Sequence, residues 1–179
     1  AVDGRDWSYL PYGPFATWSH YQQWLVSVSA QDDPLFYAVV DRATEQAVGV
    51  ASLMRIDAAN GVIEVGHIYY SPLLQRTIAG TEAMYLLMRH IFELGYRRYE
   101  WKCNALNEPS RRAALRLGFS FEGVFRQAAV VKGHNRDTAW YSLLDSEWPA
   151  CQRAFEQWLA PDNFISAQPV RSLSQWREV

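Results

Sequence analysis

The turn over residues 75–81 is where this sequence could bind an anion. Gly80-Thr81-Glu82-Ala83 opens an apolar-periodic helix directly after a strand. The first backbone N–H groups of a helix have no partner within the helix, and the aligned peptide dipoles place positive charge at that end. A phosphate fits there. The sequence therefore predicts either a site for a pyrophosphate-bearing cofactor or a helix cap that binds nothing.

Alternating strands and helices surround this turn. Apolar residues recur at three- and four-residue spacing over 81–94, which predicts a helix with Gly95 after its end. The other predicted helices cover 18–28, 109–117 and 148–159. The predicted strands cover 35–41, 47–56, 62–70, 96–103, 121–132 and 138–144.

The order of these elements predicts the fold. Three consecutive strands joined by short turns favour antiparallel pairing. The strand–helix–strand step around 81–94 favours a parallel crossover. We therefore expect an α+β fold, with a mixed, mostly antiparallel, twisted sheet and flanking helices. One domain is expected over 1–179, with a core over about 17–160, an irregular arm over 1–15 and a loosely held tail over 161–179.

Composition restricts the partners. A net charge of −2 gives no basic field for nucleic acid. No run reaches the roughly 18 apolar residues of a membrane helix, and no signal-peptide pattern opens the chain. Only Cys103 and Cys151 are present, which forms neither a disulfide framework nor a zinc set and suits a reducing compartment. We expect a cytoplasmic protein with no metal, as a monomer or a homodimer.

Four stretches between Leu35 and Trp148 carry short motifs in a specific order. They are 63–69 (IEVGHIY), 75–83 (QRTIAGTEA), 107–110 (NEPS) with 117–119 (LGF), and 122–126 (EGVFR) followed by Asp137, Tyr141 and Glu147-Trp148. Each motif is weak alone. Together they resemble the GNAT superfamily of acyl-CoA N-acyltransferases, and within it the RimJ/RimL-like ribosomal-protein N-acetyltransferases.

Two features depart from the family pattern. Ile78 stands where the family loop usually has its first Gly, and Ile does not readily adopt a positive φ. Either this loop position has an ordinary backbone conformation here, or the phosphate contact is weaker. In addition, the Arg-Leu-x-Leu-Arg strand with which such proteins open does not occur before Trp18.

The resemblance implies an acetyl-CoA-dependent N-acetyltransferase. Acetyl-CoA would be the co-substrate, and a primary amine would attack it directly in a ternary complex. The acceptor would be a protein N-terminus or a small molecule. Two alternatives stay open. One is a non-catalytic acyl-CoA-binding or regulatory domain with the same fold, which Ile78 favours. The other is a protein interaction module that uses its aromatic surface.

Three residues are candidates for moving protons. Glu64 lies on the strand that runs beside the acyl group in this fold, and it would take a proton from the amine. The alternative is a solvent-facing strand carboxylate. His67 is a second candidate base, or a packing or surface residue. Ser110, by its family position, would protonate the leaving thiolate, or it is ordinary first-turn polarity.

The resemblance also implies which residues bind acetyl-CoA. The backbone N–H groups expected at the acetyl carbonyl are those near Ile68, Tyr69 and Tyr70. The groups expected at the pyrophosphate are Gln75, Arg76 and the N–H groups of Ala79, Gly80 and Thr81. Asn104 or Asn107 would hydrogen-bond the pantetheine amide, although Asn107 could equally be a loop or capping residue.

Overall fold

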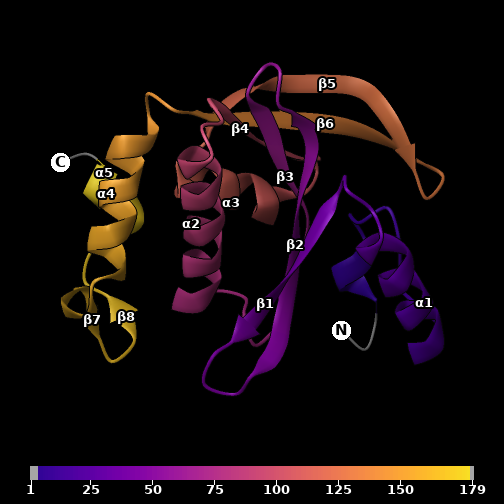
Figure 1. Ribbon diagram of the computed structural model, residues 1–179, viewed down its shortest axis with the longest axis horizontal. Coiled ribbons are helices and arrows are strands. Elements are labelled where there is room, and N and C mark those ends of the chain that lie inside the picture. The colour runs from indigo at the N-terminus through magenta and orange to yellow at the C-terminus, as the bar shows by residue number, and fades with distance from the viewer. Residues whose placement is uncertain (1–3, 178–179) are drawn as a thin grey trace.

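Six strands form one twisted sheet with helices on both faces (Figure 1). The computed structural model describes residues 4–177. Its elements are η1 (Arg5–Trp7), α1 (Trp18–Ser29), β1 (Leu35–Asp41), β2 (Gln46–Asp57), β3 (Val62–Tyr70), α2 (Ile78–Glu93), β4 (Arg98–Asn104), α3 (Glu108–Leu117), β5 (Ser120–Val131), β6 (His134–Leu144), α4 (Trp148–Leu159), η2 (Pro161–Asn163), β7 (Phe164–Ile165), β8 (Gln168–Pro169) and α5 (Leu173–Arg177).

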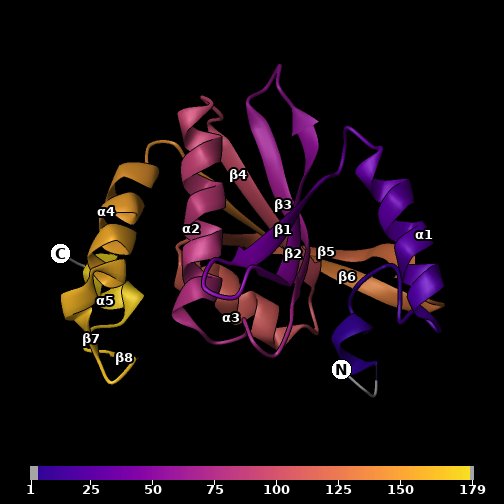
Figure 2. The same cartoon turned by 60° about the horizontal axis from the view of Figure 1, so that its bottom comes forward.

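The strand order across the sheet is β1-β2-β3-β4-β6-β5. β3 and β4 pair in parallel with α2 as the crossover, and the other neighbouring strands in this sheet pair antiparallel. The predicted α+β fold with a mixed, mostly antiparallel sheet is therefore confirmed. α2 and α3 lie on one face of the sheet and α1 lies on the other, as both views show (Figures 1 and 2).

The core lies on the face that α2 covers. The apolar stripe predicted for this helix is confirmed, since Met84, Met88 and Ile91 are buried. They belong to one core cluster with Tyr99 of β4 and Tyr141 of β6. Burial of each such side chain stabilises the fold by about 1.5–3 kcal/mol. Within residues 4–177, no helix combines the length and the apolar character that a membrane crossing requires.

Two predicted starts were wrong by three residues or more. α2 begins at Ile78, three residues before Thr81, because Thr77 is its N-cap and accepts a hydrogen bond from the Gly80 N–H at 3.1 Å. β6 begins at His134, because the turn before it is confined to Lys132 and Gly133, both with positive φ. A two-residue turn of this kind matches the twist of a hairpin.

The predicted loose tail is also wrong for the residues that the structure describes. The segment after α4 folds back as η2, β7, β8 and α5. Asn163 is buried, donates to the carbonyl of Trp158 at 3.0 Å and accepts from the N–H of Arg171 at 3.0 Å. Leu173 is 1% exposed and joins the core cluster. One buried amide and one buried apolar side chain therefore hold this segment against α4.

Candidate functional site

β3 and β4 separate at their carboxyl ends, and this opening is the candidate site. Their parallel pairing ends at Val65 and Trp101. β3 then continues along β2 to Tyr70, while β4 continues along β6 to Asn104. The last backbone groups of β3 therefore lack ladder partners on β4. Such a crevice at the carboxyl ends of parallel strands is where open α/β sheets bind ligands.

A bulge at His67 alters β3 within this opening. Between its pairs at Gly66 and Tyr69, β3 advances by three residues while β2 advances by two, from Val50 to Ser52. The backbone of His67 has φ 50°, in the left-handed region that few non-glycine residues adopt. A bulge leaves one residue outside the ladder and re-aims its neighbours. The ladder between β2 and β3 is therefore interrupted between Gly66 and Tyr69.

Ile68, Tyr69 and Tyr70 follow the bulge, and all three are partly buried. Tyr70 ties the strand to the next turn, because its hydroxyl donates to the carbonyl of Gly80 at 3.2 Å. Its carbonyl accepts from Gln75 Nε2 at 2.7 Å. The structure therefore brings the predicted carbonyl-binding and pyrophosphate-binding segments together.

The turn leads into α2, and two of the first N–H groups of this helix have no hydrogen-bond partner among residues 4–177. Those of Ile78 and Ala79 precede the helical hydrogen-bond pattern, whereas the side chain of Thr77 occupies that of Gly80. Ile78 is the first residue of the helix, so its position has an ordinary backbone conformation. Arg76 has φ 60° instead. The departure at Ile78 therefore does not require strain.

Thr81 lies inside α2 and is buried, which places its side chain away from the turn. Its Oγ1 accepts a hydrogen bond from Arg116 Nη2 at 2.6 Å. Arg116 is in the last turn of α3 and brings a positive charge to the first turn of α2. No sequence motif pointed to Arg116, because only the packing of α3 beside α2 places it there.

The start of α3 lies at the carboxyl end of β4. Asn107 is the N-cap of α3, with Oδ1 accepting from the N–H of Ser110 at 3.3 Å. Asn104 Oδ1 accepts from the N–H of Leu106 at 2.9 Å. Ser110 Oγ accepts from the indole N–H of Trp101 at 3.0 Å. That bond uses the oxygen of Ser110 as an acceptor, and the Ser110 hydroxyl also hydrogen-bonds the Cys103 side chain.

Glu64 is buried between two cations. Its Oε2 lies 2.8 Å from Lys102 Nζ and 3.1 Å from Arg55 Nε, and the residue is 4% exposed. Burial raises the pKa of Glu64, and the charges of Lys102 and Arg55 oppose that shift. This burial excludes the alternative of a solvent-facing carboxylate.

His67 is partly buried beneath the N-terminal arm. Its ring stacks on Tyr12 with centroids 5.4 Å apart and lies 5.1 Å from the ring of Phe36. Burial lowers the pKa of His67, and the positive charges of Arg55 and Arg136 lower it further. Nδ1 is buried without a hydrogen-bond partner among residues 4–177. A neutral imidazole is therefore favoured at neutral pH.

The N-terminal arm is anchored over the end of β3. Trp7 stacks on Tyr69 with centroids 4.5 Å apart. Lys132, at the tip of the β5–β6 hairpin, donates to the carbonyls of Trp7 and Tyr12 at 2.8 and 3.1 Å. The arm, α1 and the hairpin therefore form a wall on the face of the sheet opposite α2 (Figure 2).

Glu122 on β5 should make a pH-dependent contribution to stability. Its hydrogen bonds from Arg98 lower its pKa to about 2. A carboxyl group whose pKa is lower in the folded than in the unfolded state stabilises the fold at pH values above its unfolded-state pKa. This contribution disappears as the pH falls toward 2. Because the side chain is 39% exposed, we expect Glu122→Gln to lose only about 1 kcal/mol at neutral pH.

Urea unfolding at pH 7 and pH 3 would measure this loss. The difference between wild type and Glu122→Gln is expected to shrink at pH 3. Glu93→Gln is the matched control, since its 3.6 Å contact with Arg89 is a surface pair. An equal difference at both pH values would contradict the assigned role of the Arg98 ion pair.

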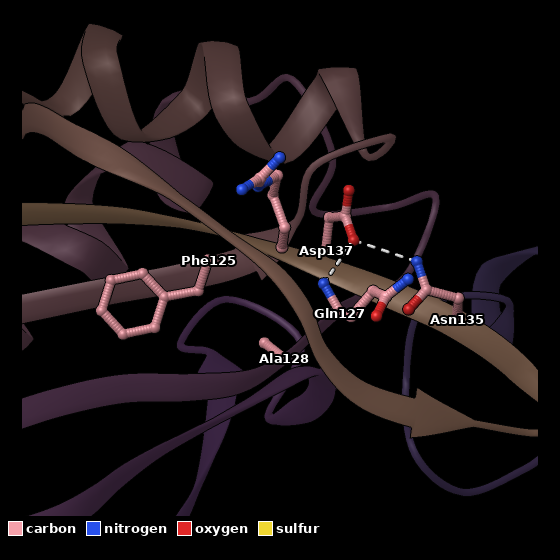
Figure 3. Close-up of a pocket in the computed structure, with 6 residues that line it drawn as sticks. Phe125, Gln127, Ala128, Asn135 and Asp137 are labelled. Carbon is pink, nitrogen blue, oxygen red and sulfur yellow. Dashed lines mark hydrogen bonds between the residues drawn. The ribbon is translucent and has the colours of Figure 1, made fainter.

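An open hollow of about 840 Å³ lies on β5 and β6 (Figure 3). Its lining residues are Phe125, Arg126, Gln127, Ala128, Asn135 and Asp137. Asp137 Oδ1 accepts from the backbone N–H of Gln127 at 2.7 Å and from Asn135 Nδ2 at 2.9 Å. Gln127 has φ 50° in a bulge of β5. Asp137, which belongs to the fourth sequence motif, therefore fixes the shape of this strand.

Residues 3–120 match the family model described as "Acetyltransferase (GNAT) domain". The crystal structure of a GCN5-related N-acetyltransferase from Brucella melitensis is 54% identical and has a TM-score of 0.96. The match covers 98% of this chain and 80% of that chain. Ribosomal-protein-serine acetyltransferase of Escherichia coli (strain K12) is 30% identical over 105 residues, 58% of this chain and 58% of that enzyme. This chain thus matches little more than half of the curated relative's length.

The solved structure of Microcin C7 self immunity acetyltransferase MccE, in complex with acetyl-CoA and AMP, is also similar. It is 27% identical with a TM-score of 0.59, and the match covers 70% of this chain and 68% of that chain.

Proposed function

The chain belongs to the GNAT acetyltransferase family, and on that premise we propose that it is an acetyl-CoA-dependent N-acetyltransferase. A primary amine attacks the thioester directly in a ternary complex, so that the C–N bond forms as the C–S bond breaks. The observation that carries this proposal is the opening between β3 and β4, with the starts of α2 and α3 at its end.

The residues around the opening fit acetyl-CoA. The free N–H groups of Ile78 and Ala79 and the positive end of α2 suit a pyrophosphate. Gln75 and Arg76 lie on the exposed side of the same turn. N–H groups over 68–70 suit a thioester oxygen on which negative charge develops. Asn104, at the carboxyl end of β4, lies where an amide of the pantetheine chain would pass.

Glu64 is the proposed base. The amine must lose its proton to attack, and a carboxylate accepts that proton directly or through one water. Burial that raises the pKa of Glu64 also makes it a stronger base near neutral pH. His67 is the alternative base on the same strand, because its lowered pKa keeps it neutral.

Ser110 is the proposed donor to the leaving thiolate. The Trp101 indole N–H occupies the Ser110 oxygen, so the hydroxyl proton is directed elsewhere. A proton from Ser110 neutralises the sulfur as the C–S bond breaks, and the serine regains a proton from water.

The acceptor is proposed to bind on the face opposite α2. Four side-chain polar atoms are buried there without a hydrogen-bond partner among the described residues. These atoms are Ser52 Oγ, His67 Nδ1, Arg136 Nε and Trp140 Nε1. Such atoms normally find a partner, and a polar acceptor would supply one. The acceptor is an amine on a protein N-terminus or a small molecule, and the similarity to a ribosomal-protein-serine acetyltransferase favours the former.

The buried free thiols of Cys103 and Cys151 suit the cytoplasm.

Calorimetric titration with acetyl-CoA tests the proposal first. We expect roughly micromolar binding, about −8 kcal/mol, and weaker heats with a truncated analogue that lacks the nucleotide phosphates. Thiol release is then measured with a peptide bearing an N-terminal serine, the same peptide with a blocked N-terminus, and small primary amines. Release of CoA with a free amine but not with the blocked peptide supports the transferase. Absence of acetyl-CoA binding would overturn it.

A further inference from the structure

A continuous row of alternating charges crosses the acceptor face of the sheet, and we call it the charge ladder. Its members in spatial order are Arg55, Glu64, Lys102, Glu100, Arg98 and Glu122. Consecutive members are joined at 3.1, 2.8, 2.7, 2.7 and 2.6 Å. The ladder runs from β2 through β3 and β4 to β5, and its charges balance.

Lys102 is the central rung. Its side chain is 6% exposed, and its Nζ contacts Glu64 Oε2 and Glu100 Oε2. The ammonium also lies 3.7 Å from the centroid of the Trp140 ring. Two carboxylates and an aromatic face therefore fix this ammonium in one position.

We propose that Lys102 is a positioning residue, which holds the Glu64 carboxylate at the opening and keeps it ionised for its task. This inference rests on the proposed function, in which Glu64 receives the proton of the amine. The geometry makes Lys102 and Glu100 act on Glu64 with opposite signs. The cation favours the carboxylate form, whereas the second carboxylate disfavours it and also competes for the same ammonium.

The charged groups facing Glu64 are few, so the effect of each can be separated. Arg55 approaches from β2, and Lys102 and Glu100 approach from β4. Arg55 is 61% exposed and screened by water, so its influence is smaller than that of buried Lys102. Removal of Lys102 should therefore change the pKa of Glu64 more than removal of either other group does.

Carbon-13 NMR titration of the glutamate carboxyls tests this without an acceptor. The Glu64 resonance is assigned by its absence in Glu64→Gln. Lys102→Met is expected to raise the Glu64 pKa by about one unit or more. Glu100→Gln is expected to lower it, and Arg55→Gln to raise it by a few tenths. Arg89→Gln, which removes a cation on the surface of α2, is the matched control and should leave it unchanged.

The pH profile of kcat/KM gives a second readout. The acid limb of the profile is expected to follow the Glu64 pKa in each variant, while the KM for acetyl-CoA stays within about twofold, because the ladder does not contact the turn before α2. A merely structural Lys102 would lower the rate at every pH.

The inference would be overturned if the pKa of Glu64 shifted in the same direction in Lys102→Met and Glu100→Gln. It would also be overturned if this pKa shifted in neither variant. If Lys102→Met does not fold, the other two variants still test the ladder. Arg55→Gln is expected to raise the Glu64 pKa and Glu100→Gln to lower it, and any other pair of shifts would contradict the ladder. An enzyme whose rate is unchanged in Glu64→Gln would count against the proposed base alone, since the carboxyl titration still decides how the ladder acts.

Discussion

Glu64→Gln is expected to lower kcat for acetyl transfer at neutral pH by roughly 10²–10⁴-fold, the range for removal of a general base. The amide keeps the shape of the carboxylate and can still accept a hydrogen bond from Lys102. It cannot accept the proton of the amine. Affinity for acetyl-CoA, measured by calorimetry, is expected to stay within about twofold, because the turn before α2 is untouched.

Variants at two positions separate this effect from a loss of structure. Glu64→Asp keeps a carboxylate one methylene shorter and is expected to retain more activity than Glu64→Gln. Glu93→Gln removes an exposed carboxylate from α2 and should leave the rate unchanged. Thermal unfolding of each variant shows whether the fold is intact.

His67 must be tested in the same way, because the acid limb alone does not identify the base. Burial raises the pKa of Glu64 and lowers the pKa of His67, so the two titrate closer together than their ordinary values suggest. A fall of less than fivefold in Glu64→Gln, with a large fall in His67→Asn, would transfer the role to the histidine.

Gly80→Ala is expected to weaken acetyl-CoA binding by roughly 5- to 150-fold, equivalent to about 1–3 kcal/mol of overpacking. A Cβ on Gly80 would lie 2.7 Å from the carbonyl oxygen of Leu74 and 3.3 Å from the ring of Tyr70. The carbonyl is backbone and cannot rotate away, so the turn must shift. That shift displaces the N–H groups of Ile78 and Ala79 that would hold the pyrophosphate.

Gly95→Ala is the matched control at the other end of α2. Gly95 has φ +89°, so alanine is strained there, but nothing lies within 4 Å of the added Cβ. It should lower stability without changing acetyl-CoA affinity, whereas Gly80→Ala changes affinity. Calorimetry and thermal unfolding of both variants make the comparison. Equal affinities in wild type and Gly80→Ala would show that the turn does not hold the cofactor in this conformation.

The sequence alone determined the six strands of the main sheet, the helices α1 to α4 and their order, because these depend on local periodicity. The stripe of Met84, Met88 and Ile91 repeats at helical spacing, and the strand over 62–70 was located to the residue. The parallel pairing of β3 and β4 followed from the crossover between them. The motif order indicated the family, which the match over residues 3–120 shows. Local rules sufficed wherever neighbours in sequence are also neighbours in space.

Only the tertiary structure decided what surrounds the candidate residues. Glu64 could have faced water, and its burial between Arg55 and Lys102 depends on the register of three strands. Charges at 98, 100 and 102 alternate with aromatic residues on β4, a signal that could have identified Lys102. The cap at Thr77 was missed because the helix pattern begins before its apolar stripe.

The packing of the segment after α4, the stacking of the arm on β3 and the approach of Arg116 to Thr81 share one physical reason. Each joins residues that are distant along the chain, as Leu173 does with the core cluster, and pairwise contacts of that kind leave no periodic trace in a single sequence. Composition and spacing therefore determine which elements form and which chemistry they carry. Burial, pairing and the resulting shifts of pKa arise only when the sheet brings those elements together.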